Sequence, residues 1–294
     1  MSVGEAAPAQ AIRSVVVHTH RNPDVTREVV QILVELAEQH GVELRFDEAE
    51  TAKHRLDGNA ATSLRPNSPD GTNSDLCIVL GGDGTTLRTL RAYAGSGVPV
   101  FAVNCGRIGF LATVDRARAR EGLERALAGE FEVIRLPSLV LGPDSDDRFA
   151  VNDVSFQRGA HMNVAHLSYS LAGEQVARAP CDGLIASTPV GSTAYNLSVG
   201  GPILAWDLRG FVVSMVAPHA LALRSLVAAP EDLLEVVNEG MEQVTIVMDG
   251  MHTGTLAPGE AAQVRFRPDV VGLAQLPGSS FYARFREKLR LLTG

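Results

Sequence analysis

A glycine-rich segment with a single ionisable side chain follows a short apolar run in the first third of the chain. The run covers residues 76–80 (LCIVL), and residues 81–85 read GGDGT. Glycines allow a tight turn that exposes backbone N–H groups to an anion, and a helix beginning there adds partial positive charge. Beside bound phosphates, Asp83 could accept a proton from an attacking hydroxyl or help to organise Mg²⁺. The alternative is a strand-to-helix turn in which Asp83 is only the N-cap.

A longer run of hydroxyl-bearing and small residues lies in the second half, at residues 181–202 (CDGLIASTPVGSTAYNLSVGGP). Small residues let a ligand approach the backbone, while hydroxyls and amides can hydrogen-bond a base or a ribose. The ring of Tyr195 can stack on a base. The alternative is a β-turn rich in Ser, Thr and Gly.

Two shorter segments add further candidates. Residues 103–111 (VNCGRIGFL) follow another apolar run, and Arg107 could meet a phosphate or be a solvated loop arginine. Asn152 and Asp153 open a strand-like run and offer an amide and a carboxylate that could hold a ribose. An Asx turn is the alternative for that pair.

The first half of the chain alternates strand-like and helical patterns. Short apolar or alternating runs predict strands, and apolar residues at helical spacing predict helices. This β-α-β-α order predicts an α/β domain with a parallel sheet. The predicted strands are 14–18, 42–46, 76–80 and 98–103, and the predicted helices are 23–40, 85–94 and 115–130.

Residues 51–75 break this rhythm. They are polar, rich in Gly, Pro, Asn and Ser, and show no periodicity, which predicts a long loop. Because this loop leads into the strand before GGDGT, it is either a flap over a site or a tolerated surface insertion.

From about residue 138 the helical pattern largely disappears and short strand-like runs follow one another, which predicts an all-β, sandwich-like domain. Residues 280–292 again have helical spacing, and we expect them to pack back on the first domain. The predicted domains are therefore 1–137 plus 277–294, and 138–276. The predicted strands are 150–156, 164–171, 184–187, 211–216, 234–237, 244–248, 263–266 and 270–276.

The amino-acid composition of the chain argues against several classes of function. The chain has 294 residues, 34 Asp and Glu against 26 Lys and Arg, and a net charge of −8, which argues against nucleic-acid or membrane-surface binding. Three widely spaced cysteines predict neither a disulfide framework nor a tightly bound structural metal, and they fit a reducing cytosol. Neither a signal peptide nor a membrane span is recognisable, so we expect a cytoplasmic protein.

Taken together, the segments resemble the NAD kinase family. Four motifs occur in the family's order: GGDGT, an NxGxxGFL segment, an Asn-acidic pair, and DGxxxSTPxGSTAY followed by GGP. The order of an α/β domain, a β-sandwich and a returning C-terminal segment is also similar. GGDGT alone is less specific, since diacylglycerol and sphingosine kinases carry a similar loop, whereas the GSTAY stretch favours NAD kinases.

The resemblance implies phosphorylation of the 2′-hydroxyl of the adenosine ribose of NAD, with ATP or polyphosphate as donor and Mg²⁺ or another divalent cation. Asp83 would be the catalytic base and residues 81–85 would hold phosphates. Asn152 and Asp153 would bind ribose and base groups, Asp182 the nicotinamide side, and residues 193–195 the adenine. The expected ligand-binding residues are Gly81, Gly82, Gly84, Thr85, Asn104, Arg107, Asn152, Asp153, Asp182, Ser187, Thr193, Ala194, Tyr195 and Ser198.

Three positions depart from the family pattern. Asp153 stands where Glu is usual, Val190 where a hydroxyl residue is common, and Met251 where a polar residue is usual. The changes at positions 153 and 190 leave a non-catalytic NAD or NADP sensor as an alternative. The GGDGT loop leaves a second alternative, a lipid or other small-molecule kinase that shares it. We also expect a homodimer or homotetramer, and a buried, hydrogen-bonded His219.

Overall fold

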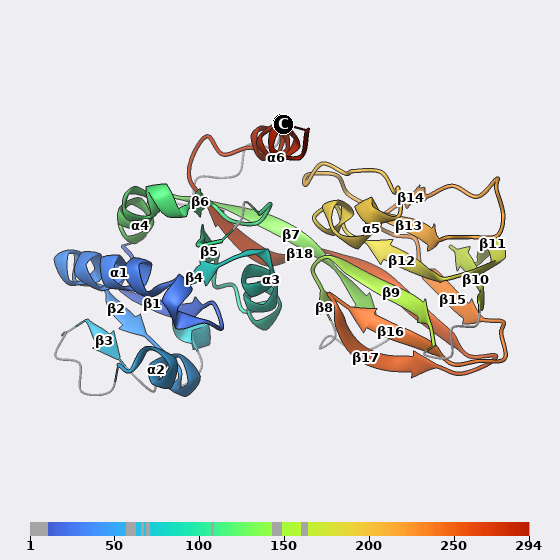
Figure 1. Cartoon of the computed structure of the whole chain (residues 1–294), viewed down its shortest axis with the longest axis horizontal. Coiled ribbons are helices and arrows are strands. Elements are labelled where there is room, and N and C mark those ends of the chain that lie inside the picture. The colour runs from blue at the N-terminus through green and yellow to red at the C-terminus, as the bar shows by residue number, and fades with distance from the viewer. Residues whose placement is uncertain are drawn as a thin grey trace. The chain divides into compact units, whose positions relative to one another are not determined.

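The structure is a computed structural model that describes residues 11–56, 63–65, 68, 71–106, 109–142, 149–159 and 164–293 (Figure 1). The chain divides into two compact units. One comprises Met1–Arg135 with Val271–Gly294, and the other Leu136–Val270. We propose that these units are its two domains.

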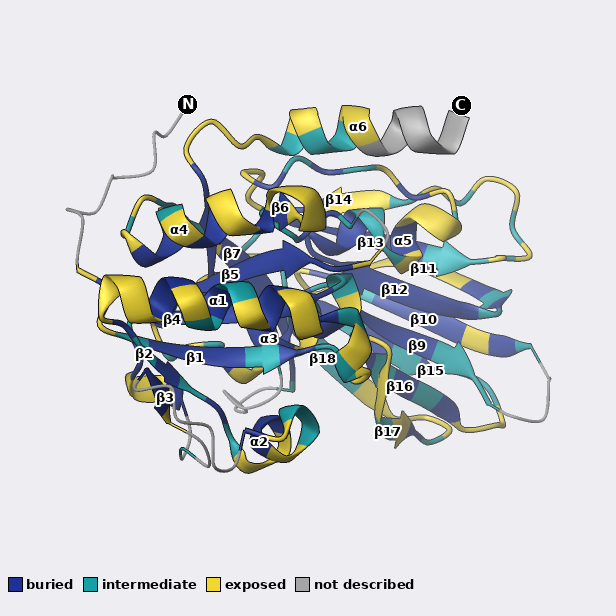
Figure 2. Cartoon of the chain, turned by 60° about the vertical axis from the view of Figure 1, so that its left-hand side comes forward, coloured by how far each residue is buried: buried dark blue, intermediate teal, exposed yellow. Residues whose placement is uncertain are grey.

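The first unit contains the expected parallel sheet. Its strands run in the order β18-β5-β4-β1-β2-β3, with β6 beside β5, and the pairings in this part of the sheet are parallel. The central strand β4 is buried along its whole length, as a strand covered on both faces must be. Figure 2 shows the same burial for most of the neighbouring strand β1. The bounds are β1 Ser14–Thr19, β2 Glu43–Arg45, β3 Leu64–Arg65, β4 Leu76–Gly81, β5 Val100–Asn104, β6 Val114–Asp115 and β18 Ala261–Gln275.

Helices cover both faces of this sheet. On one face α1 packs against α4, whereas α3 lies on the opposite face and contacts β1, β4 and β5 (Figures 1 and 2). The bounds are α1 Arg27–His40, α2 Glu48–His54, α3 Asp83–Ala92, α4 Ala119–Leu127 and α6 Phe281–Thr293, with 3₁₀ turns at Pro23–Val25, Gly71–Asn73 and Arg116–Arg118.

Capping residues near each end determine where the helices begin and end. Asn22 caps the 3₁₀ turn that precedes α1, since its side chain accepts a hydrogen bond from the backbone N–H of Asp24. Gly41 ends α1 in the left-handed conformation, at φ +67°, which glycine adopts at little cost. The predicted helix therefore begins with one 3₁₀ turn and becomes α-helical at Arg27.

The second unit is the predicted β-sandwich. One sheet has the order β11-β10-β15-β18, with β7 pairing β18 and β8, and the other has the order β14-β13-β12-β9-β16-β17. Buried apolar side chains of both sheets, including Leu167 and Phe156, form one core. The bounds are β7 Glu132–Leu141, β8 Phe149–Ala150, β9 Asp153–Arg158, β10 Ala165–Leu171, β11 Glu174–Cys181, β12 Gly183–Ser187, β13 Phe211–Val216, β14 Leu226–Ala228, β15 Leu234–Asn238, β16 Val244–Met248 and β17 Met251–Leu256.

Several local predictions were wrong. Residues 51–54 belong to α2, because Asp47 caps that helix by accepting a hydrogen bond from the Glu50 N–H at 2.7 Å. The loop prediction overlooked this cap, and residues 57–62, 66, 67, 69 and 70 lie outside the described part of the chain. The two strands predicted at 263–266 and 270–276 are parts of the single strand β18. The strands β3, β6, β7, β11, β14 and β17 were not predicted.

The C-terminal helix α6 forms where helical spacing predicted it. Its Arg284 Nη1 donates a hydrogen bond to the Phe110 carbonyl at 3.0 Å, which ties the helix to the loop after β5. Within the described residues, none of the helices combines the length and apolarity needed to cross a membrane.

Candidate active site

The glycine-rich loop turns the chain from β4 directly into α3. Gly81 ends the strand, Gly82 is the extended N-cap residue, and Asp83 is the first helical residue. A Cβ atom on Gly81 would lie 2.8 Å from Cβ of Thr85, so this position has no room for a side chain without a shift. The loop thus lies at the carboxyl end of a buried parallel strand and at a helix N-terminus, which together favour an anionic ligand.

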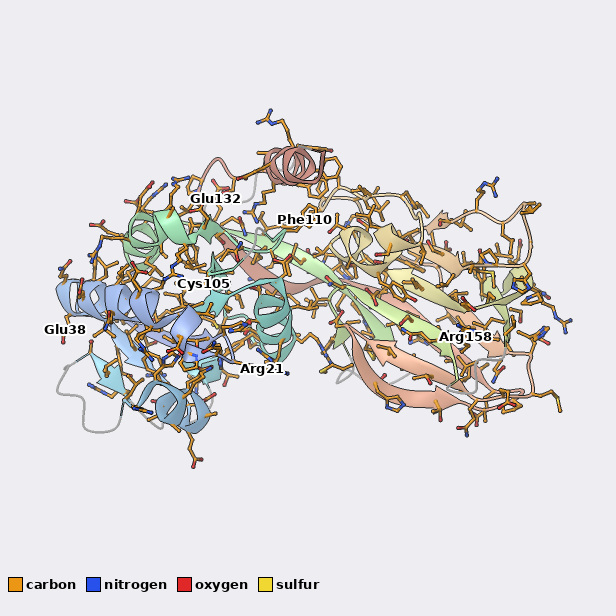
Figure 3. The ribbon with its side chains drawn as sticks, in the orientation of Figure 1. Arg21, Glu38, Cys105, Phe110, Glu132 and Arg158 are labelled. Carbon is orange, nitrogen blue, oxygen red and sulfur yellow. The ribbon has the colours of Figure 1, made fainter. Side chains whose placement is uncertain are left out.

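The Asp83 carboxylate is held by the loop that follows β5. Its Oδ2 accepts a hydrogen bond from the Phe110 N–H at 2.8 Å, and its Oδ1 accepts one from the Leu111 N–H at 3.1 Å. Phe110 is labelled in Figure 3. Because an ionised carboxylate has about four acceptor sites, it retains capacity to accept a hydrogen bond from a substrate hydroxyl.

Asn104, a predicted ligand-binding residue, lies beside the glycine-rich loop. It is the residue of β5 that faces Gly81 in the parallel register, and the Cys105 N–H donates to the Gly81 carbonyl at 2.9 Å. The Asn104 side chain is buried, and its Oδ1 accepts a hydrogen bond from the Gly106 N–H at 3.0 Å. Arg107, the predicted phosphate ligand in this segment, lies outside the described residues.

Arg284 is a site candidate to which the sequence argument assigned no role. Its half-buried guanidinium bonds the carbonyl of Phe110, whose N–H binds Asp83. Burial lowers the pKa of Arg284 to about 10, against the opposing effect of the Asp83 carboxylate. The residue belongs to the C-terminal segment FYARFREKL, so the family-like ending of the chain was the signal that could have identified it.

In the second unit, the structure brings Asn152 and Asp153 next to the start of the hydroxyl-rich turn. The Asn152 carbonyl accepts hydrogen bonds from the Thr188 N–H at 2.9 Å and the Ser187 hydroxyl at 3.2 Å. A Cβ atom on Gly191 would lie 2.0 Å from the same carbonyl oxygen, so only glycine fits there. These two sequence motifs therefore form one cluster.

Asp249 organises this cluster and was not predicted. Its Oδ1 accepts hydrogen bonds from the N–H groups of Asn152 and Asp153, at 2.7 and 3.1 Å, and its Oδ2 accepts one from the Val151 N–H at 2.9 Å. Because Asp249 is almost 100 residues from these partners, no local pattern could have revealed the contact.

Asp153 is a buried carboxyl, with 6% of its surface exposed. Burial, and secondarily the negative charge of Asp249, raise the pKa of Asp153 to about 7. Within the described residues its carboxyl has no hydrogen-bonding side-chain partner, so its polar atoms remain available to a ligand.

Most hydroxyls of the GSTAY turn bind the protein itself. Thr188 Oγ1 donates to the Val151 carbonyl at 2.6 Å, and Ser192 Oγ donates to the Pro189 carbonyl at 2.6 Å. Thr193 Oγ1 donates to the Val190 carbonyl at 3.1 Å. Tyr195 is 37% exposed, so its ring remains accessible. The turn thus uses these hydroxyls within the protein, and it presents backbone and Tyr195 more than free hydroxyls.

Asp182 and Ser198, at the two ends of this motif, lie apart from the residues at its centre. Asp182 precedes β12 whereas Ser187 ends it, which separates them by roughly 16 Å at about 3.3 Å per residue. Asp182 forms an ion pair at 3.3 Å with Arg158, which is labelled in Figure 3. Ser198 is exposed at the end of α5 (Tyr195–Ser198). Val190 is buried. His219 was predicted to be buried, but the structure exposes it.

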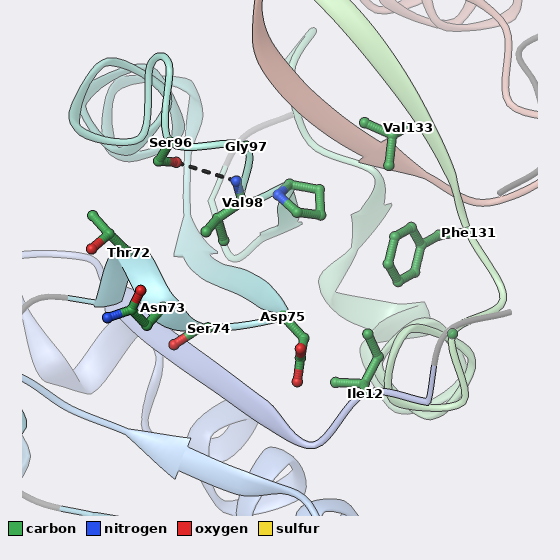
Figure 4. Close-up of a pocket in the computed structure, with 12 residues that line it drawn as sticks. Ile12, Thr72, Asn73, Ser74, Asp75, Ser96, Gly97, Val98, Phe131 and Val133 are labelled. Atoms are coloured by element: carbon green, nitrogen blue, oxygen red, sulfur yellow. Dashed lines mark hydrogen bonds between the residues drawn. The ribbon is translucent and has the colours of Figure 1, made fainter. Parts of the chain in front are cut away.

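Cavities of the first unit lie at both the amino-terminal and the carboxyl-terminal ends of its parallel strands. A cavity of about 420 Å³ lies at the amino-terminal ends of β4 and β5, where Asp75 and Val98 line it and the Val98 N–H donates to Ser96 Oγ (Figure 4). None of the predicted site residues lines it. A cavity of about 330 Å³ is lined by Thr19 and Thr85, at the carboxyl ends where ligands of such sheets bind.

Comparisons with known proteins identify the family of the chain. The ATP-NAD kinase N-terminal domain family matches residues 14–131, and the ATP-NAD kinase C-terminal domain family matches residues 151–271. An NAD kinase of Gemmatimonas aurantiaca is 38% identical over 226 residues, covering 74% of this chain and 78% of the relative. An NAD kinase of Methylibium petroleiphilum is 33% identical over 273 residues, covering 90% of each.

A solved structure shows the same fold. Yeast NADH kinase complexed with NADH superposes with a TM-score of 0.85 at 22% identity, covering 97% of this chain and 89% of that one. The two domain families occur in the same order as the two units described above, and the relatives exceed 30% identity over most of their length. The chain belongs to the NAD kinase family.

Proposed function

We propose that this protein is an ATP-dependent NAD kinase that phosphorylates the 2′-hydroxyl of the adenosine ribose of NAD to give NADP. The observation that carries the proposal is the Asp83 carboxylate, fixed by two backbone N–H groups at the carboxyl end of β4. The family assignment and the relatives named NAD kinase support the reaction class. They do not favour a non-catalytic sensor or a lipid kinase.

The transfer is a displacement at the terminal phosphorus of ATP. Asp83 accepts the 2′-hydroxyl proton, the ribose oxygen forms a bond to phosphorus, and the bond to the ADP oxygen breaks. ADP leaves with the bonding electron pair. In such transfers the protein mainly positions the reactants and neutralises charge, so this chain needs no covalent nucleophile.

We propose that Mg²⁺ arrives as part of the substrate MgATP. Mg²⁺ prefers phosphate and water oxygens with one or two carboxylates, and it seldom needs a cage of protein ligands. Among the residues that the structure describes, no group of three or more His, Cys, Asp or Glu side chains could hold a metal. A single carboxylate, Asp83, beside a phosphate-binding loop fits a metal carried by the nucleotide.

The remaining ligand roles follow the family motifs. We propose that residues 81–85, with Asn104 and Arg107, hold phosphates, and that Asn152 and Asp153 bind ribose and base groups of NAD. Residues 193–195 would shape the adenine pocket, Asp182 would bind the nicotinamide side, and Ser187 and Ser198 would be further ligand-binding residues. Their support is the sequence motif and, for the residues that the structure describes, the local geometry.

We further propose a cytoplasmic homo-oligomer. All three cysteines are free and buried, which fits a reducing compartment. The strand β14 ends its sheet and exposes Leu226 and Val227, an apolar surface that a second copy could cover. Light scattering of the purified chain measures the oligomeric state directly.

The test of the proposed reaction is NADP formation from NAD with ATP and Mg²⁺, measured with an NADP-specific dehydrogenase. Asp83→Asn should keep NAD binding, measured by calorimetry, and lose about 10²–10⁴-fold in kcat, the usual contribution of a general base. Turnover of this variant near the wild-type rate would remove Asp83 from the role of base. Absence of NADP formation by folded wild-type protein that binds NAD would contradict the kinase assignment itself.

A further inference from the structure

The cavity at the amino-terminal ends of β4 and β5 lies at the opposite end of the strands from Asp83. Its volume is about 420 Å³, within the range of about 300–1,000 Å³ that is usual for small-molecule pockets. Asp83 begins α3, whereas Ser96 and Gly97, which follow the end of that helix, line the cavity. Because the ten residues of α3 span about 15 Å, the cavity is separate from the proposed catalytic site.

Apolar side chains form one side of this cavity. Ile12, Phe131 and Val133 lie together there (Figure 4). Val98 and Pro99 add further apolar surface. The Phe131 ring packs against the core of the unit but is only partly buried, so it offers aromatic surface to a bound molecule. This side of the cavity suits an apolar or aromatic body.

The other side of the cavity is polar. Thr72, Asn73 and Ser96 lie there, across the space from Phe131 (Figure 4). The neighbouring Ser74 is 7% exposed, and its hydroxyl has no hydrogen-bond partner within the described ranges. Since buried hydroxyls are normally hydrogen-bonded, the cavity wall contains a polar group that the protein itself does not use.

Asp75 is the one ionisable side chain among the described residues that line the cavity. Its Oδ2 accepts hydrogen bonds from the N–H groups of Arg13 and Ser14, both at 2.9 Å, and from the Ser14 hydroxyl at 3.1 Å. Its Oδ1 makes no such contact with the described part of the chain. One oxygen of the carboxylate therefore holds the start of β1, and the other can accept hydrogen bonds from a ligand.

The Asp75 carboxylate is ionised near neutral pH. Burial would raise its pKa, but the hydrogen bonds from Arg13 and Ser14, together with the charge of Arg13, lower the pKa below its ordinary value of 3.8. The Arg13 side chain is exposed and does not line the cavity. The described residues that line the cavity thus contribute one negative charge and no positive charge.

Two helices end beside the cavity and add to its negative potential. α3 ends at Ala92, shortly before Ser96, and α4 ends at Leu127, two residues before Gly129. The C-terminus of a helix carries a partial negative charge and interacts favourably with cations. Together with Asp75, these helix ends favour a positively charged ligand over a neutral or anionic one.

We propose that this cavity is a binding site for a small amphipathic cation, a molecule that carries a primary ammonium group on an apolar or aromatic body. The ammonium group donates a hydrogen bond to Asp75 Oδ1, and its other two donors face the polar side of the cavity. The body of the ligand packs on Ile12, Phe131 and Val133. The site is distinct from the one that contains Asp83, and it does not depend on the reaction assigned to that residue.

The test is calorimetry of the full chain with three probes that share an indole ring. Tryptamine carries an ammonium group, tryptophol a neutral hydroxyl and indole-3-acetate a carboxylate. Tryptamine should bind at least about 10-fold more tightly than tryptophol, because a hydrogen bond to a charged group typically contributes that much. Indole-3-acetate should bind more weakly than tryptophol, since its charge has the same sign as that of Asp75.

Two variants separate the charge from the cavity. Asp75→Asn keeps one oxygen to accept the N–H groups at the start of β1 but removes the charge, so it should weaken tryptamine binding by about 10-fold or more and change tryptophol binding little. Val133→Phe fills the cavity without changing Asp75 and should abolish binding of both probes. The matched control is Asp232→Asn, which removes a carboxylate that also accepts a backbone N–H, that of Ala229 at 3.0 Å. It should bind tryptamine as the wild type does.

Absence of tryptamine binding to the wild type would overturn the proposal, and so would equal affinity for the three probes. If Asp75→Asn weakened tryptamine binding while Val133→Phe left it unchanged, the amine would bind outside the cavity and the assignment would be wrong. Thermal unfolding identifies any variant that does not fold. Should Asp75→Asn be such a variant, Val133→Phe and the three probes still decide the outcome.

Discussion

Gly109 and Asp83 lie so close together that a Cβ atom on Gly109 would stand 2.0 Å from Oδ1 of the carboxylate. The absence of a side chain at residue 109 is what lets the next two backbone N–H groups reach both carboxylate oxygens. The position of the proposed base therefore depends on a glycine 26 residues away in the sequence.

We predict that Gly109→Ala lowers kcat by about 10²-fold or more, because the new methyl group must displace the Asp83 carboxylate from its two hydrogen bonds. Steady-state kinetics measures this. The matched control is Gly106→Ala in the same loop, where a Cβ atom would be in ordinary contact, 3.8 Å from Asn104 Oδ1. If both variants were equally active, Asp83 would not require this geometry.

Arg284 should support catalysis through Phe110. We predict that Arg284→Ala lowers kcat by about 10–100-fold, the equivalent of one hydrogen bond to a charged group. The change removes the hydrogen bond to the Phe110 carbonyl and a positive charge near Asp83. Arg286→Ala, an exposed arginine on the same helix, is the control and should retain wild-type kcat. Equal loss in both variants would point to disturbance of α6 as a whole.

Asp249 should determine NAD affinity more than turnover. Asp249→Asn replaces one of two acceptor oxygens by a donor, so at least one of the three N–H groups of residues 151–153 loses its partner. We predict a raised KM for NAD and a free energy of unfolding lower by about 1–3 kcal/mol. Asp232→Asn, at an exposed turn where Asp232 bonds the Ala229 N–H, should change neither KM nor kcat. An unchanged KM for NAD in Asp249→Asn would contradict the role assigned to this contact.

The raised pKa of Asp153 predicts a particular dependence of stability on pH. In the folded protein this pKa is about 7, against an ordinary value of 3.8, so the folded state holds the proton over a range in which the unfolded state has lost it. Stability should therefore fall as pH rises from about 4 to about 7, by as much as about 4 kcal/mol, and then level off. Asp153→Asn should remove this component.

Denaturant unfolding at pH 5 and pH 8 measures the difference. The wild type should lose more stability between these values than Asp153→Asn does, while the exposed Asp207→Asn should follow the wild type. Parallel curves for all three proteins would show that the carboxyl of Asp153 titrates near its ordinary pKa.

The sequence predicted the local elements of the first unit well, because each depends on residues within a few positions. The burial pattern of α1, with Val29, Leu33 and Leu36 inward, follows from helical spacing, and Gly41 ended the helix where a C-cap was expected. The apolar run of β4 indicated a strand covered on both faces, and all its residues are buried. The short helix α2 was missed because a polar composition outweighed the Asp47 cap.

In the second unit, different features could not be predicted from the sequence. Edge and outer strands such as β11 and β17 were not predicted, since they alternate weakly and owe their conformation to pairing with neighbouring strands. The motifs located the Asn152 and GSTAY segments, but the sequence predicted only part of the chemistry of their side chains. The hydroxyls of Thr188 and Ser192 bond the backbone carbonyls of Val151 and Pro189, which the sequence did not reveal.

The sequence by itself determined the fold class, the glycine-rich turn and the family, because these rest on periodicity and on short motifs in a set order. The tertiary structure alone decided how the base is held and which distant groups support it. The contacts of Asp83 with Phe110, of Arg284 with Phe110 and of Asp249 with Asn152 join residues 27 to 174 positions apart. Such contacts depend on strand order and register, which packing of the whole sheet selects and no local pattern encodes.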